Sequence, residues 1–345
     1  MSMSPREVIQ AAVNFREPDR IPFFISAHGI IRRQRGMVME QFYQRPPEEQ
    51  AGFAVDIIRQ YGGDIVLAGL SGTLSVKALG GKVKFRAKGS TDVLEPLITD
   101  IAELDKINLD RVKDDFHYQR SLEVSRRIVA LMGDEYLVST LFWGPFTLAG
   151  LLIGVEQLMR KCLRDKEAVR ALLDFCVELI KVCNEETIGL GMGMGGLAEP
   201  TASGDMISRK VFEEFALPYL KKVYDWYRAK KLITTLHICG DITNRLDLIP
   251  ETGTHVLSLD YKVSMKTAAE TLGDKLVIAG NADPVGIIME GDEEMVRKAY
   301  LEIFEQVQGV PYALMGGCSI PGATPLANYE VMRDLAYNTV PHYRH

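Results

Sequence analysis

Short apolar runs alternate along the chain with longer stretches in which apolar residues recur at helical spacing. Most of the short runs are continuously apolar, which is typical of strands buried on both faces of a parallel sheet. There are eight such runs, at 21–26, 64–69, 136–142, 195–200, 232–238, 255–260, 276–281 and 312–317. The main helical stretches lie at 5–15, 48–62, 165–191, 209–231 and 292–309. The alternation predicts an α/β protein with a parallel sheet.

Eight strands with helices between them and no clear linker predict a (β/α)8 TIM barrel that spans residues 1–345 as a single domain. An open, doubly wound sheet is the competing fold, and the number of strands favours closure. Residues 70–100 predict a small insertion after the second strand, with a β-hairpin within 75–88.

Composition and charge narrow the classes of function. The chain is 47% hydrophobic and 25% charged, which is average for a globular protein, and its net charge of −6 argues against a nucleic-acid partner. We find no apolar run of 18 residues and no secretory signal pattern, so we expect no membrane insertion. Five cysteines without disulfide-framework spacing favour a reducing compartment, and we expect a cytoplasmic protein.

The barrel prediction also locates the active site, because catalytic groups in this fold gather where strands end and βα loops begin. Polar and metal-binding residues occupy those positions: His28, Trp143, Glu199, Ser203, Asp205, His237, Cys239, Asp260, Asn281, Asp283 and Cys318.

Three of these residues form a candidate metal site. His237 and Cys239 lie two apart and therefore point to the same face of a strand, while Cys318 follows the last strand. Two sulfurs and one imidazole suit a zinc ion with an open fourth position. The alternative interpretation is that all three are packed core residues, and spacing alone leaves both open.

A glycine-rich stretch imitates a nucleotide-binding motif. GMGMGG at 191–196 fits G-x-G-x-x-G, but that fingerprint needs a strand before the glycines and a helix after them. Here a helix precedes the glycines and a strand follows, so we expect a loop that binds no dinucleotide.

Several motifs together resemble the uroporphyrinogen decarboxylase superfamily, and within it the methylcobamide:coenzyme M methyltransferases. They are PREVIQAAVNFREPDRIPF, WGPFTLAGLLIGVEQLMRKCLRDKEAV, EPTASGDMISRKVFEEFALPYLKKV, LHICGD, GNADP and GGCSIPGATPLAN. The resemblance implies that His237, Cys239 and Cys318 hold a zinc ion. From their positions at the strand ends, Glu199 and Asp205 are candidates for a fourth ligand or for partners that orient His237. Decarboxylases of the superfamily carry a motif like RQAGRY near the N-terminus. Here Arg32, Arg33 and Arg35 are present, but that motif is absent.

The implied activity is transfer of a methyl group from a methylated corrinoid, held by a separate corrinoid protein, to a small-molecule acceptor. The acceptor would be a thiol such as coenzyme M, or tetrahydrofolate. Demethylation of a small substrate onto a corrinoid protein, porphyrinogen decarboxylation and a non-catalytic corrinoid-handling role are the alternatives. We expect the substrate-binding residues to be Glu199, Ser203, Asp205, Asn281, Asp283, Trp143 and His28. A structural role competes at Asp205, which could cap the helix that begins near Ser208.

Overall fold

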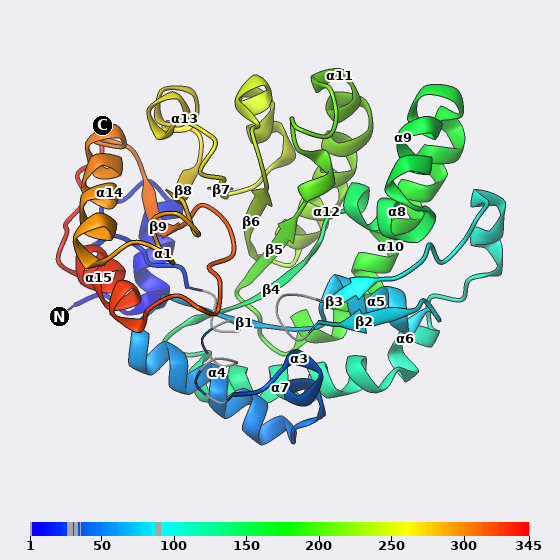
Figure 1. The fold of residues 1–345 in the computed structure, drawn as a ribbon, viewed down its shortest axis with the longest axis horizontal. Coiled ribbons are helices and arrows are strands. Elements are labelled where there is room, and N and C mark those ends of the chain that lie inside the picture. The colour runs from blue at the N-terminus through cyan, green and yellow to red at the C-terminus, as the bar shows by residue number, and fades with distance from the viewer. Residues whose placement is uncertain (1, 26–29, 31–33, 35, 87–90, 345) are drawn as a thin grey trace.

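A curved parallel sheet forms the centre of the computed structural model, and helices cover its outer side (Figure 1). Within residues 2–25, 30, 34, 36–86 and 91–344, which the structure describes, this sheet has seven strands in the order β1-β4-β5-β6-β7-β8-β9, and every neighbouring pair is parallel. The strands are β1 (Ile65–Ala68), β4 (Leu137–Trp143), β5 (Met194–Ala198), β6 (Ile233–Ile238), β7 (Val256–Leu259), β8 (Val277–Ala282) and β9 (Tyr312–Gly316). The predicted α/β class and seven of the predicted strands are confirmed.

The strand predicted at 21–26 is wrong for residues 21–25, the part of it that the structure describes, because they form no strand of this sheet. Phe23 forms a single isolated parallel bridge with Leu314 of β9. Phe24 donates its amide to Leu314 at 2.9 Å, and the Phe23 carbonyl accepts from Asp64, just before β1, at 2.8 Å. The pairing does not extend toward the N-terminus, because Pro22 has no N–H and the Phe23 N–H is bound to the Asp64 carboxylate at 2.7 Å. The segment therefore lies between β9 and β1 without completing an eighth strand.

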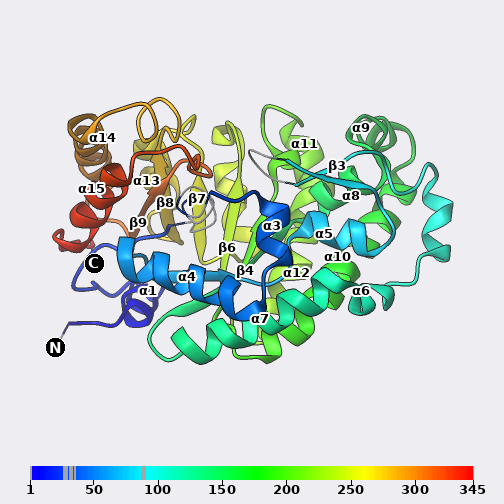
Figure 2. The same cartoon turned by 60° about the horizontal axis from the view of Figure 1, so that its bottom comes forward.

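The helices run over the outer face of the sheet and around its ends (Figure 2). The α-helices are α1 (Pro5–Val13), α3 (Met39–Gln44), α4 (Pro47–Tyr61), α5 (Gly72–Ala78), α6 (Arg111–Asp114), α7 (Phe116–Met132), α8 (Pro145–Ile153), α9 (Val155–Arg164), α10 (Lys166–Gly189), α11 (Arg209–Val211), α12 (Leu217–Ala229), α13 (Met265–Leu272), α14 (Glu293–Gln306) and α15 (Leu326–Tyr337). The 3-10 helices are η1 (Ile101–Lys106), η2 (Pro200–Ala202) and η4 (Thr243–Thr252).

The helix predicted at 209–231 contains a π-helical segment, η3 (Phe212–Ala216), between α11 and α12. Pro218, two residues after the end of η3, has no N–H to donate to the carbonyl of Glu214, so the regular hydrogen-bond pattern is interrupted there. The order of elements around the glycine-rich stretch is the predicted one, because α10 precedes it and β5 begins within it.

The region predicted as an insertion contains a hairpin, but not within 75–88. Strand β2 (Val83–Phe85) pairs antiparallel with β3 (Thr91–Val93), and the first part of the predicted hairpin is the helix α5. Residues 72–76 are all buried, so their apolar pattern has no period that distinguishes a helix from a strand.

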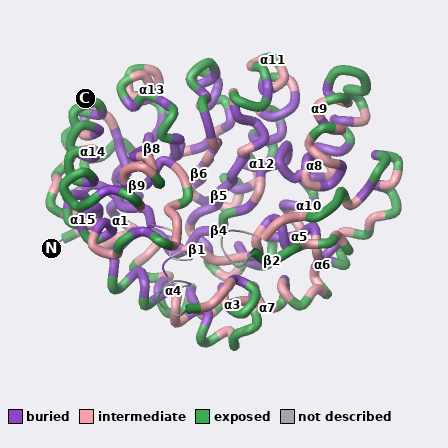
Figure 3. The backbone as a smooth tube through the Cα atoms, viewed as in Figure 1, coloured by how far each residue is buried: buried purple, intermediate pink, exposed green. Residues whose placement is uncertain are grey.

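Two apolar layers cover the two faces of the sheet. The larger core lies between the sheet and the helices. The strands, which lie at the centre of the molecule, are largely buried (Figure 3). A second cluster on the inner face joins Leu137 of β4, Met194 of β5 and Val256 of β7 to Ile9 and Ala12 of α1. Helix α1 therefore covers the end of the sheet at which the strands begin. The predicted site residues follow the strands, at the opposite end.

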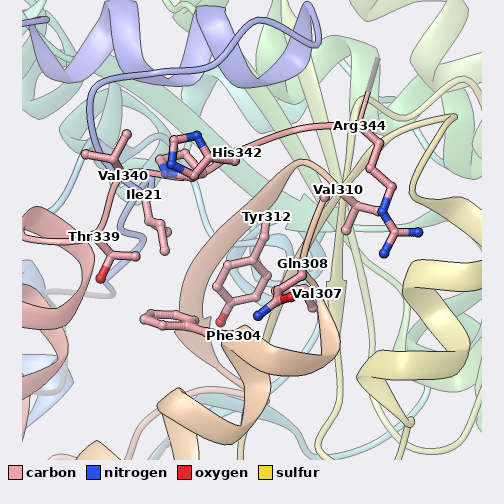
Figure 4. A pocket seen from close by; sticks show the side chains of 12 residues that line it. Ile21, Phe304, Val307, Gln308, Val310, Tyr312, Thr339, Val340, His342 and Arg344 are labelled. Carbon is pink, nitrogen blue, oxygen red and sulfur yellow. The ribbon is translucent and has the colours of Figure 1, made fainter.

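A cavity of about 540 Å³ lies at the closed end, beside the start of β9, where the C-terminal segment packs (Figure 4). It is lined by Ile21, Phe304, Val307, Gln308, Gly309, Val310, Tyr312, Thr339, Val340, Pro341, His342 and Arg344. Val310 precedes β9 whereas Cys318 follows it, so this cavity and the predicted metal site lie at opposite ends of the sheet. Among the described residues, no helix is long and apolar enough to cross a bilayer.

Candidate metal centre

The structure brings together three side chains that are distant in the sequence. Cys239 Sγ lies 3.2 Å from His237 Nε2 and 3.7 Å from Cys318 Sγ, and one ligand atom of each residue falls within 4.8 Å of the others. His237 lies in β6, Cys239 directly follows β6, and Cys318 follows β9. All three are partly buried, and among the described residues they form the one such group of histidine, cysteine or carboxylate side chains.

The spacing of these atoms fits a tetrahedral zinc ion. Bond lengths of about 2.3 Å to sulfur and about 2.0 Å to nitrogen imply tetrahedron edges of about 3.8 Å between two sulfurs and about 3.5 Å between nitrogen and sulfur. The observed separations are 3.7 Å and 3.2 Å. A metal could therefore bind with little movement of the three side chains, and its fourth position would stay open.

Ser258 of β7 orients the imidazole. His237 Nδ1 lies 3.2 Å from the Ser258 carbonyl oxygen and 3.0 Å from its Oγ. A proton on Nδ1 donated to these oxygens leaves Nε2 as the free acceptor, which is the tautomer that a metal ligand needs. Ser258 was not among the predicted site residues, although its position two residues before Asp260 places it on the same strand face.

The two thiols are hydrogen-bonded to each other across 3.7 Å. This hydrogen bond lowers the pKa of Cys318 well below the usual value of a thiol and raises the pKa of Cys239. His237 also lowers the pKa of Cys318. The lowered pKa of Cys318 favours its thiolate, and thiolate is the form that ligates zinc.

The backbone beside Cys239 is fixed by two loops. Gly240 has a φ of +79°, which favours glycine, and a Cβ there would lie 2.4 Å from both Ser203 Oγ and Asp205 Oδ2. The Gly240 amide donates to Asp260 Oδ2 at 2.8 Å. Asp260, at the end of β7, thus holds the turn that presents Cys239.

The backbone just before Cys318 is also constrained. A Cβ at Gly317 would lie 2.6 Å from the Tyr261 amide nitrogen and 2.7 Å from the Asn281 carbonyl oxygen, so only glycine fits. Asn281 Nδ2 donates to the carbonyls of Asp260, at 3.0 Å, and Val263, at 2.7 Å. The predicted pocket residue Asn281 is therefore buried and ties together the loops that flank the two cysteines.

Glu199 follows β5 and is fully buried. Its carboxylate accepts from the amides of Phe146, at 3.1 Å, and Thr147, at 2.5 Å, at the N-terminus of α8. Burial raises the pKa of Glu199 to about 7. Its own amide donates to the His237 carbonyl, but its side chain is bound to α8 and lies outside the three-residue group, so its role as a ligand stays a prediction.

Asp205 does not cap the helix that follows it. Ser208 is the N-cap of α11, and Asp205 instead forms an ion pair of 2.7 Å with Lys262 from the loop after β7. Ser203 is buried and accepts from the Asp205 amide at 3.1 Å. The sequence analysis missed Lys262, because nothing in its local pattern indicates a partner 57 residues away.

Arg245 fixes the loop that carries Ser203 and Asp205, and the sequence analysis missed it as well. The side chain is fully buried, and its guanidinium donates to the carbonyls of Ala202, at 3.0 Å, and Ile207, at 2.7 Å. The sequence does not indicate this role of Arg245, because an arginine after a polar turn is usually an exposed residue.

The remaining predicted residues lie around the ends of the strands. The Trp143 indole donates to Thr73 Oγ1 at 2.9 Å and packs against Gly72, which ties β4 to α5. Asp283 accepts from the Val285 amide at 2.9 Å and so holds the turn after β8. His28, Arg32, Arg33 and Arg35 lie outside the described residues.

A family model described as uroporphyrinogen decarboxylase (URO-D) matches residues 4–339. The chain belongs to this family. Methylcobamide:CoM methyltransferase MtbA of Methanosarcina acetivorans is 33% identical over 217 residues, which cover 63% of this chain and 62% of the relative. MtbA of Methanosarcina mazei is 31% identical over 251 residues, covering 73% of this chain and 72% of the relative. The resemblance to this branch is confirmed, although the chain spans less than two thirds of the first relative.

A solved methyltransferase structure from Methanosarcina mazei shares the fold of this family member. It superposes with a TM-score of 0.86 at 22% identity, over 97% of this chain and 98% of the other. The curved parallel sheet and its surrounding helices are therefore common to both proteins.

Proposed function

We propose that the protein is a zinc-dependent methyltransferase that moves a methyl group from a methylated corrinoid to a small thiol. The observation that carries the proposal is the convergence of His237, Cys239 and Cys318 at the open end of the sheet. The MtbA relatives support it, because their names specify a methylcobamide donor and coenzyme M as the acceptor.

The residues of the chain have distinct parts in this reaction. His237 and the two cysteines would hold the metal, Ser258 fixes the imidazole, and Asp260 holds the turn beside Cys239. An acceptor thiol bound to zinc at these three residues would have a lowered pKa, which would supply a nucleophilic thiolate at neutral pH. The acceptor sulfur then bonds to the methyl carbon as the cobalt–carbon bond breaks, and cobalt(III) leaves as cobalt(I) with the electron pair.

The donor must approach from outside the sheet. A corrinoid is too large to enter the space enclosed by the strands, so a separate corrinoid protein would dock over the loops that follow them. The acceptor would occupy the inner face, next to the three ligands. Coenzyme M, another thiol and tetrahydrofolate are the candidate acceptors, and a thiol is favoured because a soft zinc site activates sulfur.

Two other reactions are compatible with the family. Demethylation of a small methylated substrate onto a corrinoid protein would use the same site in the reverse direction. Porphyrinogen decarboxylation would give no role to a soft ligand set whose sulfur and nitrogen atoms have zinc-like spacing.

The test is an anaerobic assay with the zinc-loaded full chain, methylcobalamin and either coenzyme M or tetrahydrofolate. We expect the methylcobalamin absorbance to fall and the methyl thioether of coenzyme M to appear by mass spectrometry. Cys318→Ser should lower the rate by about a hundredfold or more, since even residues that only orient metal ligands contribute about 10–100-fold. Cys162→Ala, which changes a buried cysteine of α9, is the matched control. Equal rates with and without zinc, or methyl transfer to neither acceptor, would contradict the proposal.

A further inference from the structure

Cys239 and Cys318 lie side by side, and both are partly exposed. Their sulfurs are 3.7 Å apart. The sulfur–sulfur bond of a disulfide is about 2.05 Å long, so the two sulfurs would have to approach each other by about 1.7 Å to form one. A movement of this size requires rotation of two short side chains and no displacement of a whole loop.

The other three cysteines are protected from oxidation. Cys162 lies in α9, Cys176 and Cys183 lie in α10, and each is at most 3% exposed. Burial raises the pKa of all three thiols, which keeps them protonated and slow to react. An oxidant in solution therefore reaches the pair formed by Cys239 and Cys318 more readily than the other three cysteines.

The backbone around the pair is fixed on both sides. The turn that follows Cys239 is held by its hydrogen bond to Asp260. The backbone just before Cys318 is packed against the Tyr261 amide and the Asn281 carbonyl oxygen. The two sulfurs can therefore meet by side-chain movement while the loops that carry them stay in place.

We propose that Cys239 and Cys318 form a redox switch, in which a small disulfide compound oxidises them to an intramolecular disulfide and the zinc ion is released. The two states exclude each other. A tetrahedral zinc site needs two separate thiolates about 3.8 Å apart, whereas a disulfide joins the sulfurs at about 2.05 Å. Of the three ligands, His237 alone would remain. The inference concerns regulation of the metal site and rests on the zinc site of the proposed function.

The reaction is a thiol–disulfide exchange in two steps. One cysteine sulfur attacks a sulfur of the small disulfide, and a mixed disulfide forms as the first small thiolate leaves. The second cysteine sulfur attacks the protein sulfur of this mixed disulfide, and the second small thiolate leaves. The two cysteines lose two electrons, which the small disulfide gains. Both small thiolates take up protons from water, and zinc leaves as Zn²⁺ with its oxidation state unchanged.

The test treats the zinc-loaded full chain with bis(2-hydroxyethyl) disulfide under anaerobic conditions. We expect about one zinc to be released per chain, detected with a chromogenic chelator. The intact mass should fall by two hydrogens relative to the reduced chain, and peptide mapping without reduction should join the peptides that contain Cys239 and Cys318. Dithiothreitol followed by zinc should restore the original mass and zinc content.

Four variants assign the reaction to this pair of cysteines. Cys239→Ser and Cys318→Ser should each accumulate a mixed disulfide, because no second sulfur can displace the remaining small thiol. His237→Ala keeps both cysteines and removes one metal ligand, so its metal-free form should still close the disulfide. The matched control is Cys162→Ala, which changes a buried cysteine of α9 and should behave as the wild type.

The outcomes separate this inference from the proposed function. Methyl transfer by the reduced chain, combined with zinc retention after treatment or with mixed disulfides at both cysteines, would overturn the inference alone. Formation of the disulfide with release of zinc, in a chain that transfers no methyl group when reduced, would overturn the function and leave the switch in place. A reduced chain that binds no zinc would overturn both.

Discussion

Glu199→Gln should remove a large pH dependence from the stability of the protein. Glu199 is fully buried, and burial raises its pKa from 4.5 to about 7 in the folded state. The folded chain therefore holds a proton that the unfolded chain releases between pH 4.5 and pH 7. The stabilisation by this proton is fully present below the unfolded pKa and is lost as the pH rises through the folded pKa.

The magnitude follows from the two pKa values. With about 7 in the folded state and 4.5 in the unfolded state, the linkage relation gives a loss of about 2.5 kcal/mol between pH 5 and pH 8. Glutamine has the same shape and does not titrate, so the variant should lack this loss. The relevant quantity is the difference in unfolding free energy between the wild type and the variant, because all other groups titrate in both.

The assay is urea unfolding at half-unit steps from pH 5 to pH 8, with the metal removed from both proteins. Relative to Glu199→Gln, the wild type should lose about 2.5 kcal/mol across this range, most of it between pH 5 and pH 7. Glu305→Gln, a change at an exposed position of α14, serves as the control and should show no such trend. A constant difference between the wild type and Glu199→Gln at all pH values would refute the reasoning.

Three further substitutions test how the site is held. Arg245→Met should lower the unfolding free energy by about 3 kcal/mol in urea titrations, because it leaves two buried loop carbonyls without donors. Arg209→Met, on the exposed surface, should change the unfolding free energy little. An equal loss of unfolding free energy in the two variants would contradict this reasoning. Ser258→Ala should weaken zinc binding about 10–100-fold in chelator competition, and unchanged affinity would show that this serine does not orient the imidazole. Gly317→Ala should lower zinc affinity by displacing the turn before Cys318, and full retention of zinc would show that the turn adjusts.

The repeating pattern of the chain was sufficient to predict the sheet. Continuous apolar runs identified seven strands, and the two-residue spacing of His237 and Cys239 placed both on one strand face. The distance to Cys318 could not be predicted, because it depends on how far β6 and β9 curve toward each other. The assignment of 21–26 failed for a local reason, since Asp64 takes the amide that a ladder would use.

Contacts between loops were beyond prediction for a different reason. The pairing of Asp205 with Lys262, the support of the β5 loop by Arg245 and the binding of Glu199 to α8 all join segments far apart in the sequence. Each depends on side-chain direction at the end of an element, where patterns of apolar residues carry no information.

The most direct test of the central claim is zinc analysis of the purified full chain, combined with X-ray absorption at the zinc edge. The structure predicts about one zinc per chain, with two sulfur ligands at about 2.3 Å and one nitrogen ligand at about 2.0 Å, and one fewer sulfur in Cys318→Ser. A chain that binds no zinc, or binds it through oxygen ligands alone, would contradict the account.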